Sequence, residues 1–126
     1  MSRYKSQGFN NTFKNARKGF NLALRSEINI RVHVIVAALV LAAAVYLKFS
    51  VIEYCIVLFA IALVICCEML NTAIEFALDS IYHNRYSRMV GMAKDISAGA
   101  VMFATVISVC IGVILYGYKI WELFIA

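Results

Sequence analysis

Proline is missing from the 126-residue chain, and glycine occurs only six times. Because these residues interrupt helices and form tight turns, their scarcity favours long unbroken helices and leaves little chain for loops. Charged residues make up only 15% of the chain, whereas hydrophobic residues make up 63%. This balance is too apolar for an ordinary soluble domain, so it predicts a single membrane-embedded domain over residues 1–126.

We also expect no secretory signal, since the first 30 residues are polar and basic and contain no apolar segment before a cleavage site. The four cysteines show no spacing typical of a metal site, and we interpret them as buried, reduced thiols that pack as small hydrophobic groups. His33 stands at the mouth of the first apolar run, where a polar interface role is favoured over a ligand or a proton carrier. The cysteines are Cys55, Cys66, Cys67 and Cys110.

Three runs carry almost no charge, at residues 34–47, 54–67 and 96–118. Each can be extended to the roughly 20 residues that cross a hydrocarbon core as a helix. The sequence therefore predicts an all-α integral membrane protein. Its spans are expected at about 30–49, 51–82 and 94–119.

The basic residues indicate how the chain crosses the membrane. Residues 1–31 hold seven lysines and arginines against the single acid Glu27, and the connection after the second span adds three more basic residues. Between the first and second spans, Lys48 is balanced by Glu53. Because short basic loops stay on the cytoplasmic side, we expect the amino terminus and the second connection in the cytoplasm and the carboxyl terminus outside.

An amphipathic helix is predicted before the first span, at about 9–25. Phe9, Phe13, Ala16 and Phe20 recur at helical spacing, with asparagines and lysines between them. The stripe fits a helix lying in the membrane interface, and it fits equally a helix packed on its own spans. The net charge of +5 is better explained by anionic lipid than by nucleic acid, because the basic residues gather at membrane edges.

Three acids, Glu68, Glu75 and Asp79, stand in the cytoplasmic half of the second span. Carboxylates inside a span are costly, so a functional role is the default interpretation. At about 100° per residue they share one helix face with Thr72, and Asn71 lies at its margin. Glu27 and the pair Lys94 and Asp95 flank the same end.

Oxygen-rich clusters of this kind suit Mg²⁺ held together with substrate phosphates, and a neighbouring lysine suits a phosphate. A carboxylate deeper in the membrane could accept the proton of a lipid hydroxyl during phosphoryl transfer. The plainer alternative is that Asn71, Thr72 and Lys94 pair with these acids to hold helices together. Three acids on one face, with two flanking segments, favour the functional interpretation.

The motifs resemble a known family. The run EMLNTAIE at 68–75 is followed by Asp79, AKDISAGAV stands at 93–101, and EINIRVH stands at 27–33. Together they closely resemble the signature of the bacterial membrane diacylglycerol kinase and undecaprenol kinase family, and the likeness runs from about Phe9 to about Tyr116.

The resemblance implies a homotrimer in the bacterial inner membrane, with active sites between subunits at the cytoplasmic interface. Such an enzyme transfers the γ-phosphate of ATP to a lipid alcohol. By resemblance, Glu68 is the general base, Glu27 and Glu75 hold Mg²⁺ and contact ATP, and Asn71 and Asp79 order the site. The remaining implied contacts are Lys94 and Asp95 on the nucleotide, with Lys94 on a phosphate, and Ala16 and Gly19 on a helix that covers ATP and admits the lipid.

The connection after Asp79 is one residue longer than the family pattern, so the resemblance assigns no role to His83, Arg85 or Tyr86. The pattern of residues 27–33 is closer to the undecaprenol branch than to the diacylglycerol branch, which remains the alternative substrate. Two other classes stay open. One is an ion-conducting or cation-binding membrane protein, although the outer halves of the spans offer few polar groups; the other is a purely structural subunit.

Overall fold

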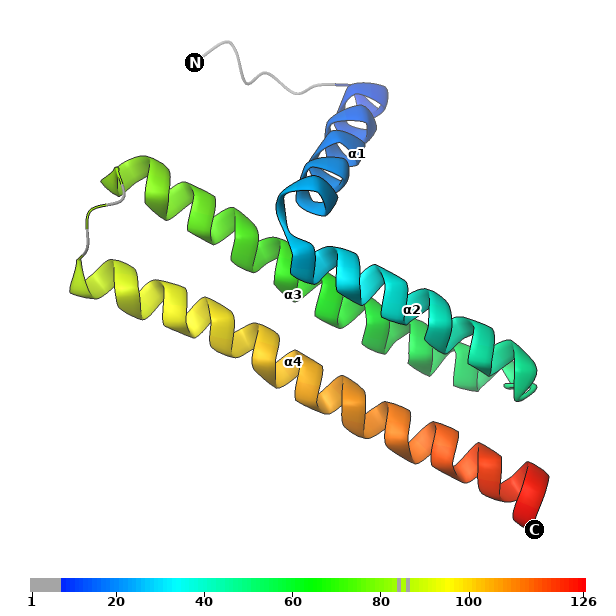
Figure 1. The fold of residues 1–126 in the computed structure, drawn as a ribbon. Helices are drawn as coiled ribbons and strands as arrows, with labels where there is room; N and C mark the ends of the chain where they lie inside the picture. The colour runs from blue at the N-terminus through cyan, green and yellow to red at the C-terminus, as the bar shows by residue number, and fades with distance from the viewer. Residues whose placement is uncertain (1–7, 84, 86) are drawn as a thin grey trace.

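The computed structural model describes residues 8–83, 85 and 87–126 (Figure 1). Within this part, three helices are long and apolar enough to cross a membrane, and a shorter helix precedes them. The predicted all-α class with three spans and an amino-terminal helix is therefore confirmed. The helices are α1 (Phe9–Ser26), α2 (Ile28–Tyr46), α3 (Val51–Tyr82) and α4 (Arg88–Ile120), and a π-helical turn (Trp121–Ile125) continues α4.

Helix α3 is the centre of the arrangement, because α2 and α4 both pack along it and both run antiparallel to it (Figure 1). Figure 1 also shows α1 leaving the bundle at the junction with α2, on the side away from α4. The start of α4 therefore lies beside the last turns of α3 and the start of α2 lies beside the middle of α3, whereas α1 points away from both.

The helices differ in length, and the difference exposes this end. With 32 residues, α3 is about 48 Å long, whereas the 19 residues of α2 span about 28 Å. Since a hydrocarbon core is about 30 Å thick, the last turns of α3 and the first turns of α4 extend past α2. Helix α4 begins at Arg88, several residues before the predicted span, because the extended backbone of Ser87 allows a helix to start there.

At the other end, a short turn joins α2 to α3. Lys48 adopts a left-handed φ of 58°, and the Phe49 amide donates to the Ala44 carbonyl at 3.1 Å, which closes α2 earlier than predicted. Ser50 and Glu53 then form a reciprocal capping box that starts α3, with the Ser50 amide 2.7 Å from Glu53 Oε2. Glu53 therefore caps a helix in addition to balancing the charge of Lys48.

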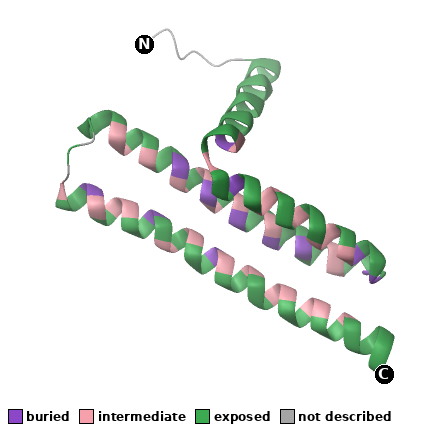
Figure 2. Ribbon diagram, viewed as in Figure 1, coloured by how far each residue is buried: buried purple, intermediate pink, exposed green. Residues whose placement is uncertain are grey.

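Few side chains are buried (Figure 2). In the most apolar windows of α2, α3 and α4, only 11%, 22% and 6% of the residues are buried. The cysteines are free as predicted, but Cys55, Cys66 and Cys110 are exposed, so their predicted burial is wrong for the single chain. They lie on helix faces that the chain turns outward rather than on the faces between helices.

The aromatic stripe of α1 is also turned outward. The exposed fraction is 83% for Phe9 and 64% for Phe13, whereas Ala23 near the junction is buried. Of the two alternatives for this helix, packing of the stripe on the chain's own spans is therefore wrong for Phe9 and Phe13. Their outward position leaves the stripe available to a lipid surface.

Candidate active site

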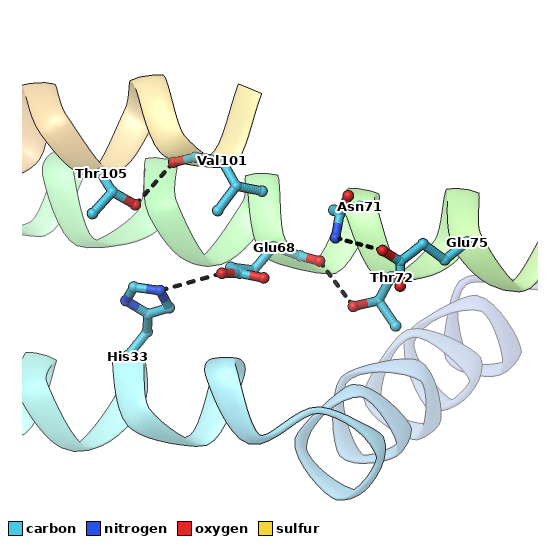
Figure 3. A network of polar contacts seen from close by, with 7 residues as sticks. All are labelled: His33, Glu68, Asn71, Thr72, Glu75, Val101 and Thr105. Carbon is cyan, nitrogen blue, oxygen red and sulfur yellow. Dashed lines mark hydrogen bonds and ion pairs between the residues drawn. The ribbon is translucent and has the colours of Figure 1, made fainter. Parts of the chain in front are cut away.

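A buried carboxylate lies at the level where the polar end of α3 meets its apolar half. Glu68 on α3 is among the most buried charged residues, and its Oε1 is 3.4 Å from Nε2 of His33 on α2 (Figure 3). The side-chain exposed fractions are 7% for Glu68 and 25% for His33. A buried carboxylate needs a polar partner close by, and the His33 imidazole is such a partner.

One turn further along α3, a chain of hydrogen bonds joins α3 to α4. Ser97 Oγ on α4 donates to Asn71 Oδ1 at 2.7 Å, and Asn71 Nδ2 donates to Glu75 Oε1 at 3.4 Å. The amide is thus held from both sides, and it in turn restrains one oxygen of Glu75. These bonds hold the Asn71 side chain between α3 and α4, and its predicted role in ordering the active site stays a prediction.

Thr72 shares the face of Glu68 but serves the backbone. Its hydroxyl donates to the carbonyl oxygen of Glu68 at 3.0 Å and does not engage the carboxylate (Figure 3). Such a bond inside a helix satisfies the hydroxyl locally. Thr72 is therefore a structural member of the polar stripe.

The end of α3 and the start of α4 enclose a small hollow whose lining includes four charged side chains. Lys94 Nζ on α4 is 2.7 Å from Oδ1 of Asp79 on α3. The hollow measures about 260 Å³, and Lys94, Asp95 and Asp79 all line it together with Arg85. Of the residues predicted to contact the nucleotide, Lys94 and Asp95 line this hollow, whereas Ala16, Glu27 and Glu75 do not. Arg85 adds a guanidinium from the connection. The other residues that line the hollow are Leu78, Tyr82, Val90 and Gly91.

Glu27 lies at the junction of α1 and α2, where its extended backbone ends one helix and precedes the next. Helices α2 and α3 are antiparallel, and His33 meets Glu68. Glu27 stands six residues before His33, so the same register puts it near the level of residues 74 and 75 on α3. Ala16 and Gly19 are both exposed on α1.

The donor set fits a hydrated Mg²⁺ ion. Within the described ranges, no three His, Cys, Asp or Glu side chains gather as a closed metal cluster. Mg²⁺ does not need one, because proteins commonly hold it through one or two carboxylates together with water and substrate phosphates. The half-buried Glu75 and the neighbouring level of Glu27 match that requirement.

A larger apolar cavity of about 660 Å³ lies among α2, α3 and α4, and its lining includes His33. Its polar lining is sparse, consisting of His33 with the hydroxyls of Thr105, Ser108 and Tyr116. Two of those hydroxyls are engaged by backbone oxygens of neighbouring helices, Ser108 by Ala60 and Tyr116 by Val40. The cavity therefore offers an apolar space that reaches the residue in contact with Glu68.

Sequence reasoning gave His33 and Ser97 too little weight. His33 stands inside EINIRVH and Ser97 inside AKDISAGAV, so both motifs contained the signal, but only the packing of α2 and α4 on α3 shows their partners. His83 closes α3 in a left-handed conformation with a φ of 48°, which gives it a capping position. Tyr86 lies outside the described residues.

Known proteins similar to this chain are kinases that act on diacylglycerol or undecaprenol by name. The family model described as prokaryotic diacylglycerol kinase matches residues 14–116. A diacylglycerol kinase of Synechocystis is 32% identical over 101 residues, which cover 80% of this chain and 58% of that protein. An undecaprenol kinase of Bacillus subtilis is 34% identical over 108 residues, or 86% of this chain and 87% of that protein. The chain belongs to the prokaryotic diacylglycerol kinase family, a family of membrane lipid kinases.

Proposed function

We propose that this protein transfers the γ-phosphate of ATP to undecaprenol at the cytoplasmic face of the bacterial inner membrane. The observation that carries the proposal is the position of Glu68. This buried carboxylate lies between an apolar cavity that reaches His33 and a polar end that holds Lys94 and Asp95. A lipid alcohol and a nucleotide approach such a carboxylate from opposite sides.

The residues support a direct transfer. Glu68 accepts the proton of the lipid hydroxyl while the hydroxyl oxygen forms a bond to the γ-phosphorus of ATP. The bond between that phosphorus and the bridging oxygen breaks, and ADP leaves with that oxygen. Lys94 and Arg85 line the hollow where the phosphates are proposed to bind, so their positive charges stabilise the negative charge of the phosphates. Asn71, held by Ser97, keeps Glu75 in place.

Mg²⁺ is the cation that this donor set suits. We assign Glu27 and Glu75 as its carboxylate ligands, and when bound the ion neutralises charge on the ATP phosphates. Asp95 is exposed at the rim of the hollow, where it can contact the nucleotide. The family pattern supports a homotrimer, and the basic segments support a cytoplasmic amino terminus and active site.

Undecaprenol is preferred to diacylglycerol on two grounds. The match with the Bacillus subtilis undecaprenol kinase covers 87% of that protein, whereas the match with the Synechocystis diacylglycerol kinase covers 58% of that one. The apolar cavity is lined almost wholly by hydrocarbon groups, so it suits part of a single isoprenoid chain, which needs no polar partners. Diacylglycerol remains the second candidate, because another relative carries that name.

The test is phosphate transfer from labelled ATP with Mg²⁺ by the purified protein in detergent, with undecaprenol and diacylglycerol offered side by side. We expect preferential labelling of undecaprenol. Glu68→Gln should abolish labelling and leave nucleotide affinity nearly unchanged, because it removes only the proton acceptor. Preferred labelling of diacylglycerol would change the assigned substrate, and labelling of neither lipid by folded protein would favour the cation-binding class.

A further inference from the structure

We propose that His33 is a positioning residue that holds the Glu68 carboxylate in the orientation needed to accept the lipid proton. The inference rests on the proposed function, because it assigns a role within the same phosphoryl transfer. His33 reaches Glu68 across the interface of two helices, with Nε2 3.4 Å from Oε1. Its ring therefore links the proposed general base to a separate structural element.

Glu68 has little other support for its carboxylate. The Thr72 hydroxyl is engaged by the backbone oxygen of Glu68, and the Asn71 side chain is engaged by Glu75 and Ser97. Of the side chains in ranges 8–83, 85 and 87–126, His33 is the one that forms a hydrogen bond or ion pair with the Glu68 carboxylate, in this case an ion-pair contact (Figure 3). A buried carboxylate with a single polar side-chain partner depends on that partner for its orientation.

The contact also distinguishes the two carboxylate oxygens of Glu68, because Oε1 faces His33 and Oε2 does not. His33 Nε2 lies 3.4 Å from Oε1, and this ion-pair contact restrains a carboxylate that ends three rotatable bonds. Oε2 is then the oxygen that we assign to receive the proton. His33 itself lines the apolar cavity, so the imidazole lies between the carboxylate and the space proposed for the lipid chain.

The position of a donor can be varied without changing its chemistry. His33→Gln and His33→Asn both place an amide N–H₂ at this site, but the longer glutamine extends about as far as the imidazole Nε2 and asparagine ends about one bond short. We expect His33→Gln to retain most of the wild-type kcat for undecaprenol. His33→Asn should lower kcat by roughly tenfold or more, because a misplaced catalytic group is inefficient.

Two readouts separate positioning from a structural role. The affinity for Mg²⁺ and ATP, measured by calorimetry, and the thermal midpoint should be equal in the two variants, because they differ by one methylene. Glu68→Asp shortens the carboxylate and breaks the contact on its own. In that background His33→Asn should change kcat by less than about threefold, since the two residues act as one unit.

The outcomes distinguish this inference from the function on which it rests. If wild-type protein labels lipid and the two His33 variants have equal kcat, His33 is not a positioning residue and the kinase proposal stands. A loss of thermal midpoint or of ATP affinity that parallels the loss of kcat in His33→Asn would likewise overturn it. A folded wild-type protein that labels neither lipid removes the kinase proposal, and the role of His33 with it.

Discussion

Ser97 shows how a small side chain can order the site. Its hydroxyl donates to Asn71 Oδ1 at 2.7 Å, and Ser97 is buried between α3 and α4. Ser97→Ala leaves that amide oxygen without its donor in a largely apolar surrounding. We expect a loss of about 1 kcal/mol in stability, the usual size for one interhelical hydrogen bond in a membrane protein. Thermal unfolding in detergent measures it.

A matched control lies on the same helix. Ser108 also donates across to α3, but its acceptor is the backbone carbonyl of Ala60, at 3.2 Å. That carbonyl belongs to a helix interior, where its own helical hydrogen bond remains, so Ser108→Ala should cost less than Ser97→Ala. An equal or larger cost at Ser108 would show that Ser97 is not specially placed by the Asn71 amide.

At the residue scale, the sequence singled out the acids of α3 as candidates but did not predict which side chains contact them. Glu68, Glu75 and Asp79 follow from helical spacing alone, since three acids on one face of an apolar helix stand out. His33 and Ser97 do not, because their partners are 35 and 26 positions away and depend on how α2 and α4 are set against α3. Glu53 was interpreted only as a charge, although the Ser-x-x-Glu spacing was sufficient to predict its capping box.

At the element scale, an ion pair fastens the far end of α4 to the start of α3. Lys119 Nζ is 3.1 Å from Glu53 Oε2 and 3.7 Å from Glu122 Oε2. The ammonium also lies 5.9 Å from the centre of the Phe49 ring. With its side chain only 12% exposed, Lys119 is shielded from water more than an ordinary surface lysine. The pair therefore positions the last turns of α4 against the α2–α3 turn.

Lys119→Met should lower the thermal midpoint of the protein in detergent, because it leaves the Glu53 carboxylate without its nearest cation. Lys48→Met is the matched control, since Lys48 is exposed at the same end of the molecule. The control should leave the midpoint nearly unchanged. Equal midpoints for both variants would mean that the ion pair does not fasten α4.

A separate prediction concerns where α1 lies relative to the lipid. Its aromatic stripe is exposed in the single chain, so we expect it to enter the lipid interface. In a Trp121→Phe background, Phe13→Trp should show blue-shifted emission in anionic vesicles and poor quenching by aqueous iodide. Lys18→Trp, about half a turn away around α1, should be quenched readily. Strong iodide quenching at position 13 would contradict interfacial placement.

Helix existence and order were predictable, whereas helix ends were less so. Long apolar runs predicted three spans, and the structure has three helices long and apolar enough to cross a membrane within the described residues. The ends depend on local backbone geometry, such as the left-handed Lys48 that closes α2 before the predicted boundary. The outward direction of the α1 stripe could not be predicted either, because the same periodicity serves burial against protein and against lipid.

For the whole molecule, the scarcity of buried side chains matters most. Exposed faces cover much of α2, α3 and α4, and a bilayer satisfies apolar ones without further partners (Figure 2). The end of the bundle that carries Lys94 and Asp95 requires polar partners and a cover for the nucleotide proposed to bind there. Ala16 and Gly19 are assigned by family pattern to cover the nucleotide, yet α1 leaves the bundle on the side away from α4, which carries Lys94 and Asp95 (Figure 1). This arrangement favours a site completed by a neighbouring chain.

Subunit mixing tests that arrangement. A Cβ atom added at Gly19 meets no atom within 4 Å apart from the adjoining backbone of its own helix, and position 19 is exposed. We therefore expect Gly19→Leu to fold and to lose activity only by obstructing a site. Lys94→Ala should lose activity by removing a phosphate contact. If one chain supplies α1 and its neighbour supplies Lys94, an equal mixture of the two variants has both native residues in about one site in four. We therefore expect co-refolded mixtures, isolated as an oligomer with the mass of three chains, to recover about a quarter of the wild-type rate. If each site were built within a single chain, the mixture would recover no activity.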